Sequence, residues 1–201
     1  MSGKNILDMM QRSQLEHDRN YHPDIHHLPT QRRVAHMVMH FAKYAGKFTI
    51  AKQTRDRQLL IDTLIDTFII CLVLSNSFNK RISDFSSITQ VSSLDLRDIA
   101  KKLSCDNDVS EENIYSFLSE NITIEAGMMA KAIESLDHLE MYPYNEILVS
   151  SLENIVTNCL ISSLYLNIDL QKAIDTRLKA VEAKSIFHDT SSCSDPINRS
   201  L

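Results

Sequence analysis

The sequence predicts an all-α protein: a helical bundle in which two helical hairpins form a four-helix core with peripheral helices. Its 201 residues include only 3 glycines and 4 prolines, so turns are few and long helices are favoured. Apolar residues recur at helical spacing through most of the chain. Gly3, Gly46 and Gly127 lie too far apart to form the phosphate loop of a P-loop or dinucleotide-binding fold, which excludes both.

The first part of the chain predicts three helices. They are expected over residues 5–19, 30–50 and 56–78. Two prolines between the first and second predict a loop over residues 21–29, and Thr30 is the expected N-cap of the second helix. The third helix is apolar on nearly every side except at Asp62 and Asp66, so it is expected at the centre of the bundle.

The second part predicts five further helices and a tail. They are expected near residues 93–104, 110–120, 123–140, 144–167 and 169–187. Ser110 and the two glutamates after it are typical of a helix start, Pro143 of a helix end, and Asp169 of an N-cap. Residues 188–201 contain almost nothing that could be buried and are expected to be disordered.

A single domain over residues 1–187 is therefore predicted. The hairpins are expected at 30–80 and 123–187, and the serine-rich stretch 80–122 is interpreted as an insert. Aligning Leu60 with Leu148 also aligns Cys71 with Cys159, which indicates an internal repeat. Coincidence between two leucine-rich helices is the alternative.

Charge and cysteine content narrow the class of protein. A net charge of −5 gives no general attraction to nucleic acid or to an anionic membrane, so neither partner is expected. Four widely spaced cysteines with no C-x-x-C pair are typical of reduced thiols, and the N-terminus lacks the apolar core of a signal peptide. We expect a cytoplasmic protein whose methionine-rich segments form core or the face of a homo-oligomer.

One helix face carries a row of positive side chains. The row, here called the basic stripe, has steps of three and four residues and consists of Arg33, His36, His40, Lys43 and Lys47. Residues 31–57 contain seven Lys or Arg and one acid. Such a row requires solvent, an anion or facing carboxylates to neutralise it.

The next helix offers two carboxylates. Asp62 and Asp66 share one face at i and i+4, and burying an unpaired carboxylate costs several kcal/mol. We therefore expect the basic stripe to neutralise them, either as a salt-bridge network that fixes the hairpin register or as part of an anion site. A metal site from two histidines, His36 and His40, with both aspartates is a third option, which the neighbouring lysines oppose.

Two segments resemble a known superfamily. The stretches DTFIICLVLSNSFN at 66–79 and NIVTNCLISSLYLNIDLQKAI at 154–174 resemble the aspartate-bearing helix of the all-α nucleotide pyrophosphatases, the MazG-like and dimeric dUTPase-like proteins. The resemblance implies a four-helix bundle in which Glu-Glu-x-x-Glu and Glu-x-x-Asp bind magnesium to hydrolyse nucleoside triphosphates to monophosphates. Asp66 matches the aspartate of the second motif.

The sequence departs from that pattern at the metal ligands. Thr63 stands in place of the glutamate of Glu-x-x-Asp, and lysines 43 and 47 stand where the first motif has glutamates. Ammonium groups repel magnesium, so the usual magnesium cofactor is disfavoured. A mixed metal site combining Glu134 and Asp137 with Asp66 is the remaining metal option.

The functional expectation follows from the stripe and the resemblance together. We expect a nucleotide or another phosphorylated small molecule to bind at the basic stripe. Asp62 and Asp66 are then the catalytic candidates of a pyrophosphohydrolase whose hydrolysis is weak or absent. The alternative is a non-catalytic interaction or scaffold module with a structural charged hairpin. The histidine-rich loop at residues 22–27 has a zinc- or nickel-binding composition, but is expected to be solvated.

Overall fold

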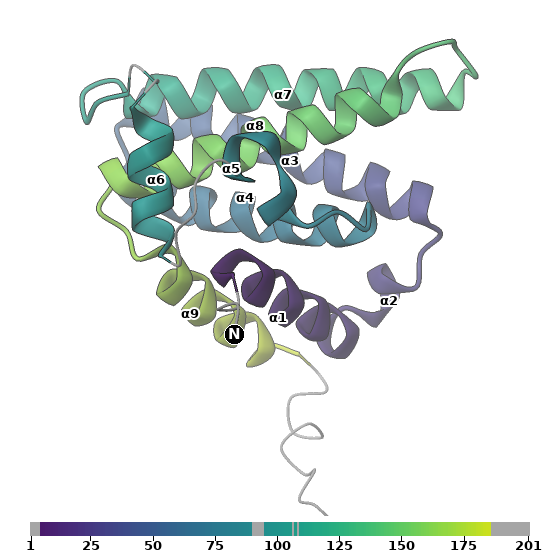
Figure 1. Ribbon diagram of the computed structural model, residues 1–201, viewed down its shortest axis with the longest axis horizontal. Helices are drawn as coiled ribbons and strands as arrows, with labels where there is room; N and C mark the ends of the chain where they lie inside the picture. Colours follow the sequence, from purple (N-terminus) through teal and green to yellow (C-terminus); the bar gives the residue numbers. More distant parts are fainter. Residues whose placement is uncertain (1–4, 90–94, 106, 108, 186–201) are drawn as a thin grey trace, which may run out of the picture.

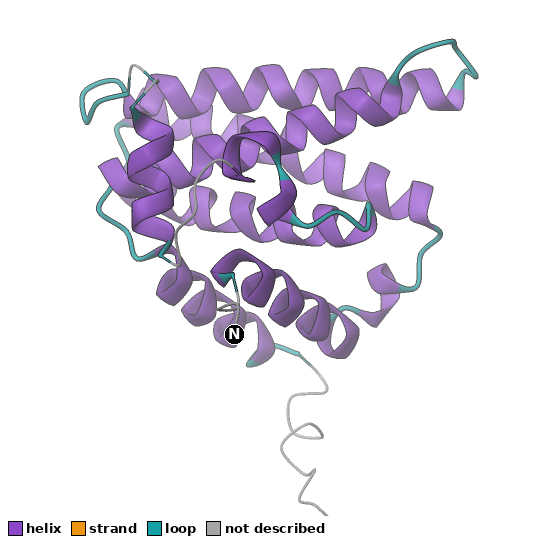
Figure 2. Cartoon of the chain, viewed as in Figure 1, coloured by secondary structure: helices purple, strands orange, loops and turns teal. Residues whose placement is uncertain are grey.

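The computed structural model describes residues 5–89, 95–105, 107 and 109–185, and within these ranges all regular structure is helical (Figure 2). The all-α prediction is confirmed. The core is a four-helix bundle of α3 (Thr30–Thr54), α4 (Arg57–Ser77), α7 (Ile114–Asp137) and α8 (Tyr144–Tyr165). Helix α3 packs against α4 and α7, and α8 packs against α7 and α4, so the two predicted hairpins lie side by side (Figure 1).

The bundle interior is built from the apolar stripes of its helices. Phe41 and Phe48 of α3 and Phe68 of α4 are fully buried in it. Helix α4 begins where the Asp56 side chain accepts a hydrogen bond from the Leu59 amide, an N-cap that satisfies one free backbone donor. A cap of this kind lets a nearly all-apolar helix start at a defined residue.

A second layer covers one face of α4. It consists of α1 (Ile6–Tyr21), the short α2 (Pro23–His26) and α9 (Leu170–Glu182), with α1 and α9 both packed on α4 and on each other (Figure 1). The Gln11 side chain donates to the Lys80 carbonyl and accepts from the Ile82 amide, which ties α1 to the end of α4. Asp169 caps α9 by accepting from the Lys172 amide, as predicted.

Smaller elements join the two halves. The 3-10 helix η1 (Ile82–Asp84) and the short α5 (Ser86–Thr89) lead to α6 (Leu96–Ser104), which packs on α8. Glu153 of α8 accepts from the Ser86 hydroxyl and from the Ser87 amide, which holds α5 against the bundle.

Several boundaries differ from the sequence prediction, among them the end of α3 at Thr54 and of α9 at Glu182. The helices expected at 110–120 and 123–140 are one helix, α7, because the buried stripe Leu118, Ile122 and Ala126 continues at helical spacing with no proline between them. The insert is correspondingly shorter than residues 80–122. Thr30 is the first residue of α3 rather than its cap, and the predicted 21–29 loop contains α2, with Pro23 at its first turn.

The two apolar helices α4 and α8 end in the same way. Asn79 and Asn167 each adopt a left-handed conformation, with φ of 53° and 54°. The amide that follows each asparagine bonds back to a serine carbonyl, Lys80 to Ser75 and Ile168 to Ser163. Cys71 and Cys159 are both fully buried. Helices α3 and α7 end with the same motif, at Arg55 and Leu139, so this ending is common to all four bundle helices and does not mark the repeat.

Length and apolar composition alone would allow α4 and α8 to cross a membrane. In each, 61% of the most apolar window is buried inside the protein. Both are central helices of the bundle, and core helices of this kind pass the same test. The fold is thus compatible with a soluble protein. The tail predicted at 188–201 lies outside the described residues.

Candidate functional site

A pocket of about 450 Å³ lies between the bundle and the second layer. It is lined by residues of α1, α2, α3, α4 and α9. All five members of the basic stripe line it: Arg33, His36, His40, Lys43 and Lys47. The structure therefore brings the whole predicted stripe to one wall of one cavity.

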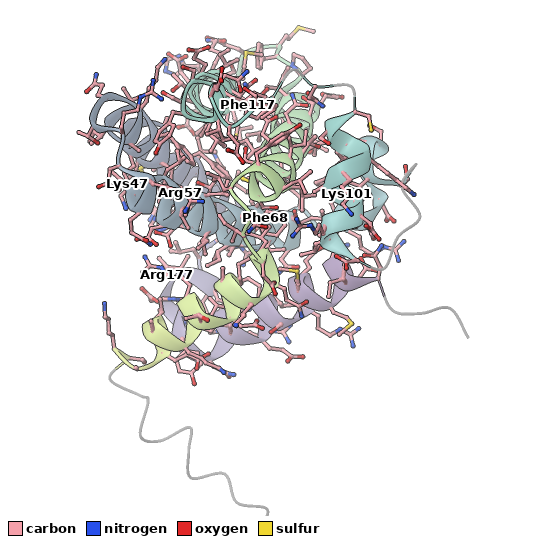
Figure 3. All side chains as sticks on the ribbon, turned by 90° about the vertical axis from the view of Figure 1, so that its left-hand side faces the viewer. Lys47, Arg57, Phe68, Lys101, Phe117 and Arg177 are labelled. Carbon is pink, nitrogen blue, oxygen red and sulfur yellow. The ribbon has the colours of Figure 1, made fainter. Side chains whose placement is uncertain are left out.

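The pocket also contains an ion pair between the bundle and the second layer that the sequence did not predict. Arg177 of α9 donates two hydrogen bonds to Asp66 of α4, from Nε to Oδ1 at 2.7 Å and from Nη2 to Oδ2 at 3.0 Å. The Asp66 side chain is 13% exposed and that of Arg177 is 44% exposed. Figure 3 shows Arg177 on the side of α9 that faces the bundle, on the same side of the molecule as Lys47. Hydrogen bonding to Asp66 raises the pKa of Arg177.

Asp62 lies outside the pocket. Its side chain is exposed and accepts a hydrogen bond of 2.9 Å from the Gln58 amide group, one turn earlier on α4. Of the two aspartates predicted to face the basic stripe, only Asp66 lines the pocket, and its direct partner comes from α9 rather than from α3. Asp62 thus lacks the position that a catalytic role in this pocket requires.

Two histidines of the stripe form a hydrogen-bonded chain with a lysine. The Lys43 ammonium, which can only donate, lies 3.0 Å from Nδ1 of His40, and Nε2 of His40 lies 3.3 Å from Nε2 of His36. Neutral His40 therefore carries its proton on Nε2 and donates it to His36. Burial, followed by the charge of Lys43, lowers the pKa of His40 to about 4. Burial also lowers the pKa of Lys43.

Tyr44 lies beneath this row of hydrogen-bonded side chains. Its hydroxyl lies 3.3 Å from Nδ1 of His40, and the residue is only 4% exposed. The ammonium groups of Lys43 and Lys47 lie over its ring, at 4.6 and 5.7 Å from the centroid. Burial raises the pKa of Tyr44, so the phenol stays protonated.

The other end of the pocket is made by α1 and α2. Arg33 donates to the His26 carbonyl at 2.8 Å, which joins α3 to α2, and burial lowers the pKa of His26. His17 is buried, and neither ring nitrogen has a hydrogen-bond partner; its Nε2 lies 3.7 Å from Glu182 of α9. Part of the predicted solvated loop, including His22 and His26, therefore belongs to the pocket wall.

The charge of the lining is positive. Four permanent cations line the pocket, Arg33, Lys43, Lys47 and Arg177, against the carboxylates Asp18 and Asp66. Five of the eight histidines of the chain line it as well. With neutral imidazoles the lining carries about +2, within a chain of net charge −5. Such a pocket attracts anions.

The acidic residues expected to hold a metal are not brought together. Glu134 pairs with Lys131 at 3.1 Å, and Asp137 accepts from Gln31 at 3.1 Å; both are exposed on α7, outside the pocket that holds Asp66. Among the described residues there is no group of three or more His, Cys, Asp or Glu side chains that could hold a metal ion. The described residues therefore form neither the mixed site of Glu134, Asp137 and Asp66 nor the predicted site of two histidines and two aspartates.

No protein-family model, no curated protein and no solved structure matches the chain. The resemblance to the all-α pyrophosphatases therefore depends on the sequence pattern quoted above.

Proposed function

We propose that the pocket binds a nucleotide or another phosphorylated small molecule, in a divergent member of the all-α pyrophosphatase superfamily that has lost the usual magnesium site. The observation that carries the proposal is the excess of cations in the lining. Four permanent charges and five imidazoles face two carboxylates in an otherwise acidic protein.

The cations can take the place of a metal in phosphate binding. Lys43 is exposed and Lys47 is partly buried, so their ammonium groups can meet a phosphate that enters from solvent. Arg177 uses Nε and Nη2 for Asp66, which leaves Nη1 to donate to a second anion. These groups neutralise a phosphate without the oxygen ligands that magnesium requires.

Hydrolysis is expected to be weak or absent. Both carboxylate oxygens of Asp66 already accept a hydrogen bond from a guanidinium, which leaves them less available to a metal ion or to an attacking water. The protein then binds its ligand without turning it over rapidly.

An interaction module is the second candidate, and exposed apolar side chains favour it. Leu139 and Met141, at the connection between α7 and α8, are almost fully exposed, and Ile124 and Met128 are exposed one turn apart on α7. These residues also support a homo-oligomer.

Thermal unfolding in the presence of pyrophosphate, AMP and ATP, each with and without magnesium, separates the two candidates. Ligand binding should raise the Tm of the wild type whether or not magnesium is present. Lys43→Ala and Lys47→Ala should lose most of that rise. Lys101→Ala is the matched control, because Lys101 lies on α6 at the opposite side of the molecule from Lys47 (Figure 3). A rise that requires magnesium, or no rise with any phosphate, contradicts the proposal.

A further inference from the structure

Much of the pocket wall is hydrocarbon. Aliphatic side chains from α4 and α9 form a row here called the aliphatic run: Ile69, Ile70, Val73, Leu178 and Val181. Ile69, Leu178 and Val181 are only partly buried, so part of their surface faces the pocket. Water against such a surface is unfavourable, and the hydrocarbon part of a ligand would displace it.

The aliphatic run starts at the ion pair and leads away from it. On α4 it follows Asp66 toward the C-terminus, and on α9 it follows Arg177 toward the C-terminus. On each helix the aliphatic run ends near α1, since Asn76 of α4 donates to the Gln11 carbonyl and Glu182 of α9 lies beside His17. The pocket therefore has an aliphatic side wall that leads from Asp66 and Arg177 toward α1, where the polar residues Gln14 and His17 line it.

The rings nearest the cations are not available to stack on a nucleobase. The face of Tyr44 is covered by the ammonium groups of two lysines. The rings of His36 and His40 pack edge to face, with centroids 4.9 Å apart. Recognition of a base usually requires an open aromatic face, whereas this wall offers aliphatic surface.

We propose that the ligand is an amphipathic anion, with a phosphate or carboxylate head beside Lys43, Lys47 and Arg177 and an alkyl or isoprenoid chain along the aliphatic run. This inference rests on the proposed function and names the class of ligand for the same pocket. The cavity of about 450 Å³ is within the usual size of small-molecule sites. The basic stripe neutralises the anionic head of the ligand, and the aliphatic run removes its hydrocarbon chain from water.

Isothermal titration calorimetry with four probes tests the inference. The probes are dodecyl phosphate below its micelle concentration, ethyl phosphate, AMP and dodecanol. Dodecyl phosphate should bind at least about tenfold more tightly than ethyl phosphate or AMP, because only it occupies both the charged and the apolar part. Dodecanol, which lacks the charge, should also bind at least about tenfold more weakly than dodecyl phosphate.

Variants assign the two parts of the ligand to the two parts of the pocket. Lys47→Ala should weaken the binding of both dodecyl phosphate and ethyl phosphate. Leu178→Ala should weaken the binding of dodecyl phosphate several-fold and leave that of ethyl phosphate unchanged. Ile69→Ala should have the same effect as Leu178→Ala, from the α4 side of the aliphatic run. Leu139→Ala is the control, because Leu139 is exposed at the α7–α8 connection, outside the pocket. Circular dichroism verifies that each variant is folded.

The outcomes separate the two levels of the argument. If AMP or ethyl phosphate binds as tightly as dodecyl phosphate, or if Leu178→Ala weakens both phosphates equally, the amphipathic ligand is wrong and the phosphate pocket stands. If dodecanol binds as tightly as dodecyl phosphate, the anionic head is wrong. If no phosphate of any kind binds, the proposed function itself fails.

Discussion

The lowered pKa of His40 predicts that the protein loses stability when the pH falls below neutrality. Burial and the charges of Lys43 and His36 lower this pKa from 6.5 to about 4, while Asp66 opposes the shift. The unfolded chain therefore binds a proton at His40 before the folded protein does. The contribution of neutral His40 is fully present above about pH 6.5 and is lost as the pH falls toward about 4.

The size of the loss follows from the shift and from the exposure of the ring. A full shift of this size corresponds to about 3 kcal/mol. Because the ring is only about half buried, solvent screening reduces the expected effect to roughly 1–2 kcal/mol. Urea unfolding followed by far-ultraviolet circular dichroism at about pH 7 and about pH 4.5 measures it.

His40→Gln removes the titrating group and keeps a hydrogen-bonding side chain. The free energy of unfolding of this variant should fall by roughly 1–2 kcal/mol less than that of the wild type between the two pH values. His138→Gln, at an exposed position just after α7, should follow the wild type. Equal pH dependence in the wild type and in His40→Gln would refute the reasoning, whatever the absolute stability of the variant.

Three further predictions concern the second layer and the pocket. Arg177→Ala should lower the free energy of unfolding in urea by about 1 kcal/mol, since it leaves the largely buried Asp66 without its partner, and Arg177→Lys should recover part of the loss. His17→Leu should leave the Tm unchanged or raise it, because the buried imidazole has no hydrogen-bond partner; a fall of several degrees would show that its contact with Glu182 stabilises the fold. Asp62→Asn should change the affinity for phosphate ligands less than twofold in calorimetry, since Asp62 lies outside the pocket, and a larger loss would place it at the site.

The sequence predicts the bundle well because helical periodicity is local. The buried stripe of α3, the apolar character of α4 and the cap at Asp169 are determined by neighbours within a few residues. The same locality explains the basic stripe, since one helix fixes which of its side chains share a face. The break predicted between residues 120 and 123 has no counterpart in α7, which runs from Ile114 to Asp137. The predicted start at Ser110 is close, since Ser110 and Asn113 exchange backbone-to-side-chain hydrogen bonds just before α7 begins.

The partner of Asp66 could not be predicted in this way. Arg177 lies 111 residues further along the chain, and no spacing rule links α4 to α9. The expected burial of Asp66 predicted that a cation must pair with its carboxylate, but which helix supplies the cation depends on how the second layer packs. His17 and His26 were missed as pocket residues for the same reason, since α1 and α2 reach the pocket only through tertiary packing.

The most direct test of the anion pocket is an NMR titration of the histidine rings with inorganic pyrophosphate. Bound anion should shift the ring resonances of His36 and His40 and raise the lowered pKa of His40, because a nearby negative charge favours imidazolium. The resonances of His138, which is exposed outside the pocket, should stay in place. If the rings of His36 and His40 are unmoved at saturating pyrophosphate, or move no more than that of His138, no anion binds at the basic stripe.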